Sequence, residues 1–294
     1  MNIDNNLENG NNQKENKQRQ KSFNGLSAKE WASLSKNVWD DVSSVRNKKQ
    51  IEHGATYSVK LVERLIRMYT KEGDLVLDPF LGTGTTLEAC RNTNRNGIGI
   101  ELNEKFIHYS DDIINQVSLK KSLSLKVIND DCRNLLKYVK ENSVQLMVTS
   151  PPYANFIHKS VEDREKTHKK SLIKIENNSV VKPYSDKKED FGNLPYNEFL
   201  EELKKLMEKL FIVTKKGGYI VWVVKDFRDT KNNIPYIPFH SDLAKLGEAV
   251  GFKYHDLIIW NQNTNRKLVL LGYPSVFYTN QNCSFIVVFR KPND

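Results

Sequence analysis

Residues 73–86 read GDLVLDPFLGTGTT, and this stretch decides the class of fold. Residues 75–77 form an apolar run after a Gly-Asp turn, which is typical of a short buried strand. The run leads into a loop that contains Gly82 and Gly84, and the next segment, TLEACRNT, reads as a helix. Glycine at such a turn lets the backbone bend sharply and approach a ligand closely. A glycine-rich turn from strand to helix is the usual place for a nucleotide-like cofactor in a doubly wound sheet.

Strands and helices alternate along most of the remaining chain. The segment NGIGIEL, residues 96–102, is a second apolar strand, which ends at Glu101. Further buried strands are expected at residues 126–128, 145–149, 219–224, 256–260 and 284–289, and helices at residues 59–71 and 197–213. This order predicts an open α/β domain with a mostly parallel sheet and helices on both faces.

Polar stretches mark the limits of this domain and interrupt it. Residues 1–22 carry too few apolar side chains to fold, so we expect a disordered polar tail followed by one domain over residues 23–294. Residues 154–193 are rich in Lys, Glu, Asp and Ser and form a long insertion. Long loops inside a compact domain are usually functional. Two shorter irregular stretches are expected at residues 226–241 and 261–275.

The first segment of this domain, residues 23–49, carries two tryptophans, Trp31 and Trp39, in a helical context. Ser27 followed by Glu30 resembles a capping box, which would start this helix. Tryptophans at such positions most often pack onto the main domain, and stacking on a nucleobase is the alternative.

The composition indicates which kind of partner the protein has and in which cellular compartment it is found. The chain has 294 residues, 38% of them hydrophobic, and its 45 Lys and Arg against 36 Asp and Glu give a net charge of +9. A basic chain suits a polyanionic partner such as nucleic acid, although a basic surface also aids solubility. The sequence contains neither a signal peptide nor an apolar run that could span a membrane, so we expect a cytoplasmic protein. The three cysteines, Cys90, Cys132 and Cys283, indicate neither a disulfide framework nor a metal site.

The charges around the glycine loop favour S-adenosylmethionine over a dinucleotide. No Lys follows the loop, so it is not a phosphate-binding Walker loop, and no basic residue stands near Thr85 to pair with a pyrophosphate. Asp78 at the strand end would repel a phosphate but suits a cofactor with an ammonium and a sulfonium group. Glu101 ends the next strand, where its carboxylate can accept hydrogen bonds from both ribose hydroxyls.

A third strand end supports the same cofactor. Asp131 follows the strand expected at residues 126–128, where its carboxylate can accept a hydrogen bond from the adenine amino group. Cys132 would then lie beside the adenine ring. In isolation either residue would be an ordinary surface position, and only the neighbouring glycine loop gives them this interpretation.

The segment Ser150-Pro151-Pro152-Tyr153 follows the strand expected at residues 145–149. Ligands of open α/β sheets bind at such carboxyl ends, although a rigid turn is the simpler explanation of the motif. Two prolines fix the backbone, so the Ser150 hydroxyl and the Pro151 carbonyl can hold an aromatic amine and draw on its protons. The amine would attack the sulfonium methyl group in line, with Tyr153 stacked on the base. These four residues are our candidate catalytic residues.

DPFLGTGTT, GIGIEL and TSPPY together resemble the cofactor loop, ribose-binding strand and catalytic tetrapeptide of the bacterial DNA amino-methyltransferases. The segment HGATYSVKLVERLI resembles the helical segment that closes over the methionine part of the cofactor in that family. The resemblance implies a Rossmann-like methyltransferase fold with a seven-stranded sheet. It also implies cofactor contacts from Tyr57, Asp78, Pro79, Phe80, Gly82, Thr83, Gly84, Thr85, Glu101, Leu102, Asp131 and Cys132.

Members of this family with Ser before Pro-Pro are mostly cytosine-N4 enzymes, whereas those with Asp or Asn are mostly adenine-N6 enzymes. The resemblance therefore implies methylation of the N4 amine of a flipped-out cytosine in double-stranded DNA, with residues 154–193, 226–241 and 261–275 as candidates for reading the site. A restriction endonuclease is a candidate partner. Adenine-N6 methylation is the first alternative, followed by RNA amino-methylation and a catalytically silent nucleic-acid-binding protein. Cytosine-C5 methylation is excluded, because no cysteine follows a proline as that reaction's nucleophile usually does.

Overall fold

The structure is a computed structural model that describes residues 22–43, 57–117, 123–153, 190–229, 232–265 and 275–294. The expected tail (residues 1–22) and the expected insertion (residues 154–193) lie almost entirely outside these ranges. None of the helices in the described ranges is both long enough and apolar enough to cross a bilayer.

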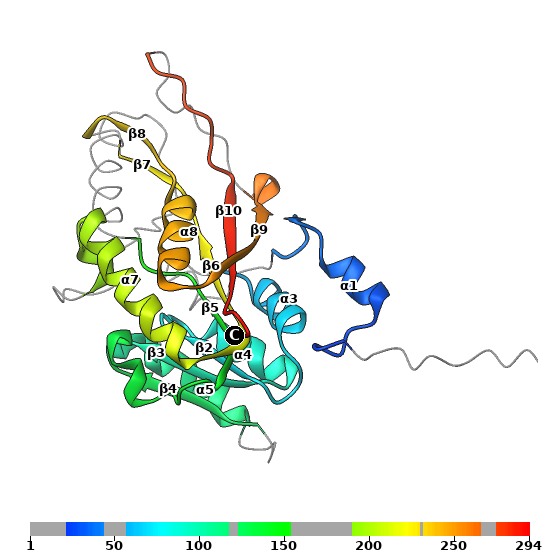
Figure 1. Ribbon diagram of the computed structural model, residues 1–294. Coiled ribbons are helices and arrows are strands. Elements are labelled where there is room, and N and C mark those ends of the chain that lie inside the picture. The colour runs from blue at the N-terminus through cyan, green and yellow to red at the C-terminus, as the bar shows by residue number, and fades with distance from the viewer. Residues whose placement is uncertain (1–21, 44–56, 118–122, 154–189, 230–231, 266–274) are drawn as a thin grey trace, which may run out of the picture.

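One large sheet organises the described part of the chain (Figure 1). Its eight strands follow the order β1-β9-β10-β6-β5-β2-β3-β4. They are β1 (Val38–Trp39), β2 (Leu75–Asp78), β3 (Asn96–Glu101), β4 (Leu125–Asn129), β5 (Val144–Thr149), β6 (Thr214–Val224), β9 (Lys253–Asn261) and β10 (Cys283–Arg290). Strand β10 runs antiparallel to β6 and β9, and all other pairs are parallel. This confirms the predicted α/β class, and each strand expected from the sequence is present.

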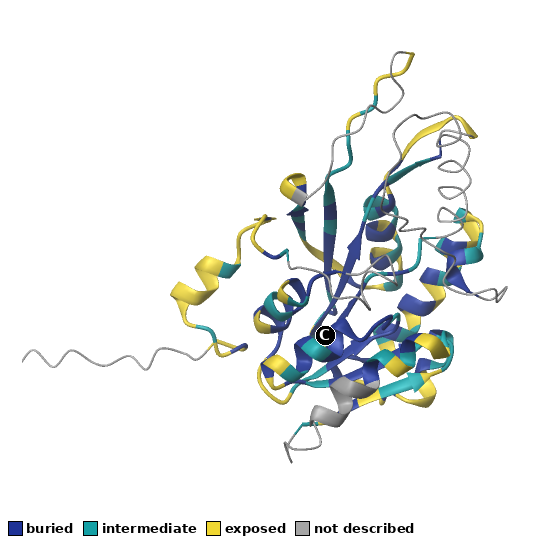
Figure 2. Cartoon of the chain, turned by 180° about the vertical axis from the view of Figure 1, so that it is seen from behind, coloured by how far each residue is buried: buried dark blue, intermediate teal, exposed yellow. Residues whose placement is uncertain are grey.

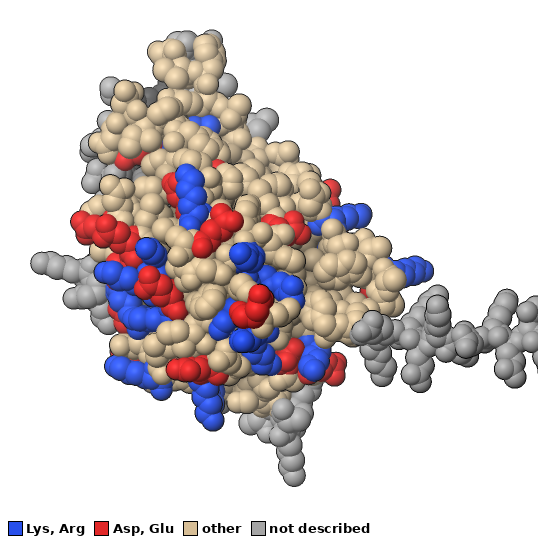
Figure 3. Space-filling model, in the orientation of Figure 1, with Lys and Arg blue, Asp and Glu red and all other residues tan. Residues whose placement is uncertain are grey.

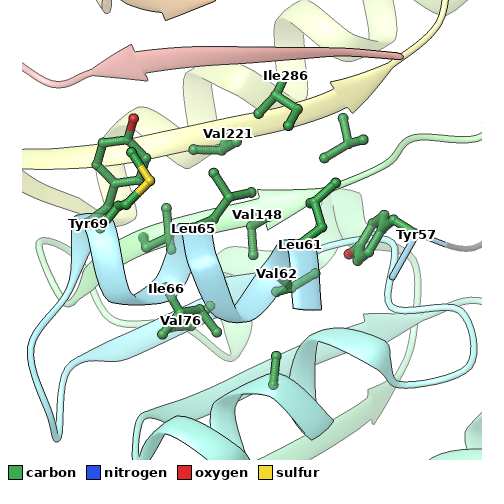
Figure 4. Packing of buried hydrophobic residues seen from close by; sticks show 14 of the residues in the cluster. Tyr57, Leu61, Val62, Leu65, Ile66, Tyr69, Val76, Val148, Val221 and Ile286 are labelled. Carbon is green, nitrogen blue, oxygen red and sulfur yellow. The ribbon is translucent and has the colours of Figure 1, made fainter. Parts of the chain in front are cut away.

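Helices cover both faces of the sheet because successive strand residues point to opposite sides. In β6, Val221 and Val223 join the core under α3 and α4, whereas Ile220 and Trp222 join the core under α7 and α8. Figure 4 shows the first of these cores, in which Leu61 and Leu65 of α3 point toward β5 and β6. The helices are α1 (Ala28–Leu34), α3 (Val59–Tyr69), α4 (Thr85–Thr93), α5 (Glu104–Val117), α7 (Tyr196–Val213) and α8 (Phe239–Val250). Three short 3-10 turns add η1 (Cys132–Lys137), η2 (Phe191–Asn193) and η4 (Asn263–Asn265).

Two expectations were wrong: that Trp39 lies in a helix, and that the sheet has seven strands. The capping box forms as predicted, with Ser27 and Glu30 bonded to each other's main chain, but α1 ends at Leu34. Trp39 instead lies in β1, which pairs with β9 and adds an eighth strand to the predicted seven. Trp39 is fully buried there, whereas Trp31 is 39% exposed on α1, a helix with no buried residues (Figure 2).

The stretch expected to be irregular at residues 226–241 contains regular structure. Strands β7 (Phe227–Asp229) and β8 (Ile234–Ile237) form an antiparallel hairpin, and α8 begins at Phe239. The hairpin follows β6, and residues 275–282 lead into β10, so both lie beyond the carboxyl edge of the parallel strands (Figure 1). This is the edge at which ligands of open α/β sheets bind.

Candidate active site

A pocket lies at the carboxyl edge of the sheet, where the segments that follow β2, β3, β4 and β5 meet. Its volume is about 820 Å³, counting the open mouth. It is lined by Tyr57, Pro79, Phe80, Leu81, Gly82, Thr83, Thr85, Ile100, Glu101, Leu102, Phe106, Asp131, Cys132, Ser150, Pro151, Pro152, Asp190 and Phe191. The glycine loop, the ribose-binding candidate and the tetrapeptide therefore share one cavity. Of the residues predicted from the sequence, Asp78, Gly84 and Tyr153 are outside this lining.

The glycine loop reaches the pocket through backbone that favours glycine. Gly82 and Gly84 have φ angles of 56° and 89°, in the left-handed region where a side chain would be strained. Gly84 is the N-cap of α4, so its role is to turn the chain into the helix. The Gly82 amide donates to Glu101 Oε2 at 2.8 Å, which fixes the loop against the end of β3.

Glu101 is held in one orientation by two backbone amides. Its second oxygen, Oε1, accepts from Asn103 N at 2.8 Å. Burial raises the pKa of Glu101 to about 7, although both amide hydrogen bonds oppose that rise. Each carboxylate oxygen has a further lone pair, so the group can still accept hydrogen bonds from a ligand in the pocket.

Asp78 does not line the pocket, so the contact predicted between its carboxylate and the cofactor stays a prediction. Its side chain is fully buried and each oxygen accepts two hydrogen bonds. Oδ1 accepts from Thr149 Oγ1 at 2.6 Å and Phe80 N at 3.0 Å, and Oδ2 accepts from Tyr57 Oη at 2.8 Å and Thr86 Oγ1 at 2.5 Å. Asp78 thus links β2, the strand before the tetrapeptide, the start of α4 and the segment before α3.

The tetrapeptide divides between the pocket and the core behind it. Ser150, Pro151 and Pro152 line the cavity. The Tyr153 ring packs edge-on against Phe239, with 6.3 Å between ring centroids, and is partly exposed. Tyr153 therefore stands just beyond the pocket lining, supported by the first residue of α8.

Asp131 and Cys132 meet the pocket at the end of β4. Asp131 caps η1 by accepting from Arg133 N at 2.8 Å, and its other oxygen pairs with Arg133 Nη1 at 2.6 Å. Burial raises the pKa of the Cys132 thiol well above its usual range, so the thiol stays neutral. A neutral, buried thiol offers an apolar surface, as the predicted position beside an adenine ring requires.

The sequence interpretation missed five lining residues: Leu81, Ile100 and Phe106, and also Asp190 and Phe191, which lie at the end of the expected insertion. Asp190 caps η2 by accepting from Gly192 N at 2.8 Å, and Phe191 packs edge-on against Phe80 at 5.2 Å. The guanidinium of Arg133 lies 4.4 Å from the Phe191 ring. Asp190 and Phe191 could have been found from the sequence, because apolar residues return in the segment DFGNL after a long polar stretch.

The chemistry of the lining fits S-adenosylmethionine. Among the described residues the lining contains three carboxylates, Glu101, Asp131 and Asp190, and no Lys or Arg, which suits a cationic ligand and not a pyrophosphate, although Asp131 is already paired with Arg133. The Thr83 hydroxyl is buried in the pocket and has no hydrogen-bond partner within the described residues, so a ligand could satisfy it. Phe80, Ile100 and Cys132 supply apolar surface for a flat ring. Among the described residues, no cluster of His, Cys, Asp and Glu could hold a metal ion.

Comparison with known proteins agrees with this chemistry. The chain is 39% identical over 114 residues to the Type II methyltransferase M.MthZI of Methanothermobacter thermautotrophicus, which covers 36% of this chain and 32% of that protein. It is 46% identical over 88 residues to M.BglI of Bacillus subtilis, covering 30% of this chain and 24% of that protein. With M.MjaVI of Methanocaldococcus jannaschii it shares 28% identity over 144 residues, covering 49% and 57%. The matched segments thus span a third or less of the first two relatives.

A family model covers much more of the chain than these local matches. The model for N6 and N4 methyltransferases, described as DNA methylase, matches residues 2–112 and 144–294. The match confirms the resemblance inferred from the motifs and supports S-adenosylmethionine as the cofactor. The chain therefore belongs to the DNA methylase family of N6 and N4 amino-methyltransferases.

Proposed function

We propose that this chain is a site-specific DNA methyltransferase that transfers a methyl group to an exocyclic amine of a DNA base. The observation that carries the proposal is that Gly82, Glu101 and the Ser150–Pro152 segment line a single acidic pocket. Residues 23–294 would form the methyltransferase domain, with the stretch 154–193 as an insertion in it.

In this proposal the chain's own residues bind the cofactor and orient the target amine, and the proton released from the methylated nitrogen passes to solvent. Bound S-adenosylmethionine supplies the electrophilic methyl group. Glu101 accepts from the ribose hydroxyls, Asp131 and Cys132 contact the adenine, and residues of the loop from Pro79 to Thr85, with Tyr57 and Leu102, enclose the rest. The Ser150 hydroxyl and the Pro151 carbonyl accept hydrogen bonds from the target amine, which directs the nitrogen lone pair for in-line attack. Tyr153 stacks on the flipped base.

We favour the N4 amine of cytosine as the target, because Ser150 precedes the two prolines as in most cytosine-N4 members of the family. Adenine-N6 methylation is the second candidate, since the same acceptors suit either amine. We further propose that double-stranded DNA is read by the stretches that follow β5, β6 and β9, and that a restriction endonuclease accompanies the enzyme.

Nucleoside mass spectrometry of DNA from cells that express the chain tests this proposal directly. We expect N4-methylcytosine to appear, and no new mark in cells that express the matched Tyr153→Ala variant. N6-methyladenine in place of N4-methylcytosine would select the second candidate. If purified protein binds the cofactor but transfers no tritium to DNA, the chain is a silent nucleic-acid-binding protein and the proposal fails.

The proposed ribose contact makes cofactor binding depend on pH. With a pKa of about 7 in the free protein, Glu101 is mostly protonated below that pH and mostly ionised above it. Because the ribose hydroxyls need a carboxylate acceptor, binding favours the ionised form. The Kd for S-adenosylmethionine should therefore be constant above about pH 8 and rise about tenfold for each pH unit below 7.

Calorimetric titrations between pH 5.5 and 8.5 measure this dependence. The control is Glu101→Gln, which keeps the shape but cannot ionise, and it should bind more weakly at pH 8 and lose the pH dependence. If Glu101→Gln binds S-adenosylmethionine at pH 8 as tightly as wild type does, Glu101 does not bind the ribose.

A further inference from the structure

A second feature of the carboxyl edge lies beyond the pocket. The hairpin β7–β8 and residues 275–282 project past the sheet (Figure 1). These two segments together form the prong. The hairpin continues from β6, the neighbour of the strand that carries the tetrapeptide, and residues 275–282 enter β10 on the other side of β6. The prong and the catalytic candidates thus share one edge of the sheet.

Side chains from both segments hold the prong together. The guanidinium of Arg228 in β7 lies 5.8 Å from the Tyr236 ring in β8 and 5.0 Å from the Tyr278 ring. Tyr236 donates a hydrogen bond of 2.6 Å to Asp226, whose buried carboxylate also accepts from the His240 main-chain amide at 3.1 Å. Since His240 belongs to the first turn of α8, the base of the prong is fastened to the domain.

The prong exposes apolar side chains. Phe277 is 77% exposed, the largest exposure among the large hydrophobic residues of the described chain, and its neighbour Val276 is 48% exposed. Tyr236 and Ile234 on β8 are 45% and 41% exposed. Exposed apolar groups gathered in one place indicate a contact surface.

The charge pattern favours contact with bases over contact with phosphates. Among the described residues of the prong only Arg228 and Asp229 are charged, whereas on the lower body in Figure 3 many Lys and Arg side chains lie among Asp and Glu. Phosphate binding needs clustered basic groups, but an apolar side chain can enter the base stack.

Resting on the proposed function, we propose that Phe277 enters the base stack of the DNA and fills the space that the extruded target base leaves. The target base must leave the duplex because the acceptors Ser150 and Pro151 lie inside a pocket. Extrusion breaks stacking and pairing, and an apolar wedge at the vacated position compensates for part of that loss. Phe277 is presented for this by a prong that Arg228 and Asp226 hold in place.

The test compares two oligonucleotide duplexes that contain the recognition site obtained by methylation mapping. One is fully paired, and in the other the target base faces a mismatch, so that it is already unstacked in part. Phe277→Ala should lower kcat/KM about tenfold or more on the paired duplex and less than about threefold on the mismatched one. Phe277→Leu, which keeps an apolar side chain, should recover most of the activity on the paired duplex.

The matched control is Phe23→Ala. Phe23 is another exposed phenylalanine, at 54%, but it packs against Tyr219 in the middle of β6, away from the carboxyl end of that strand. The Phe23→Ala variant should have the wild-type kcat/KM on both the paired and the mismatched duplex. Methylation of the two duplexes by the wild-type protein tests the proposed function separately. If the wild-type protein methylates neither duplex, the proposed function itself is wrong.

Three results would overturn the inference while the enzyme remains active. An equal loss on both duplexes, or no loss, shows that Phe277 does not assist extrusion. If sedimentation shows that Phe277→Ala converts a dimer to a monomer, with the same loss on both duplexes, the prong is an interface between two copies of the chain.

Discussion

Replacing Tyr153 with alanine is expected to lower the rate of methyl transfer to DNA at least about 10²-fold, because a misplaced reacting group typically costs that much. Stacking of a base on an aromatic ring contributes about 1–3 kcal/mol, which alone accounts for much of this loss. The ring has the support that stacking needs, since Phe239 holds its edge from the first turn of α8. Cofactor affinity should stay at the wild-type value, because Tyr153 is outside the pocket lining.

Single-turnover transfer of tritium to duplex DNA and calorimetric titration with the cofactor separate these two effects. The control is Tyr153→Phe, which keeps the ring and removes only the hydroxyl, and it should remain close to wild type. If the alanine and phenylalanine variants are equally impaired, the hydroxyl and not the ring is what matters. If the alanine variant turns over normally, Tyr153 has no part in the reaction.

The shared pocket was predictable because parallel strands impose it. Gly82, Glu101 and Ser150 each follow a short apolar run, and the carboxyl ends of parallel strands lie along one edge. Strong periodicity likewise predicted α3, α4 and α7 to within a few residues. The sequence therefore determined which segments surround the site without any knowledge of side-chain partners.

Helix α8 was missed because its sequence contains a residue that disfavours helices. Gly247 lowers the helical propensity of FHSDLAKLGEAV. In the structure a Cβ at Gly247 would stand 2.3 Å from Cε1 of Phe289 in β10, so the close packing of helix on sheet requires glycine there. That requirement comes from a contact between segments more than 40 residues apart, which local patterns do not contain.

The position of Asp78 could not be predicted for a similar reason. A carboxylate at the end of a strand can face the cleft or the core, and the sequence alone does not distinguish these cases. Its three hydroxyl partners, Tyr57, Thr86 and Thr149, come from separate segments that only the folded chain brings together. Asp78 therefore acts as a buried connection between the elements around the pocket.

Replacing Asp78 with alanine is accordingly expected to destabilise the protein and to weaken cofactor binding as a consequence. The change leaves at least two donors without an acceptor, the buried Thr149 Oγ1 and the partly buried Phe80 N, at about 1–3 kcal/mol each. Burial raises the pKa of Asp78, so removing the carboxyl group also relieves a desolvation penalty that offsets part of this loss. We expect a net loss of roughly 2–4 kcal/mol in the free energy of unfolding, measured by urea denaturation.

Asp78→Asn distinguishes this structural role from the direct charge contact that the sequence suggested. The amide oxygen can still accept from Thr149 and Phe80, and its NH₂ group can donate to the Tyr57 and Thr86 hydroxyls, so the network largely survives. The asparagine variant should therefore retain most of its stability and its cofactor affinity. If Asn and Ala weaken cofactor binding equally while the Asn variant stays fully stable, the negative charge itself acts on the cofactor. If Asp78 acts only as a buried connection, cofactor affinity should fall in parallel with stability, slightly in the Asn variant and strongly in the Ala variant.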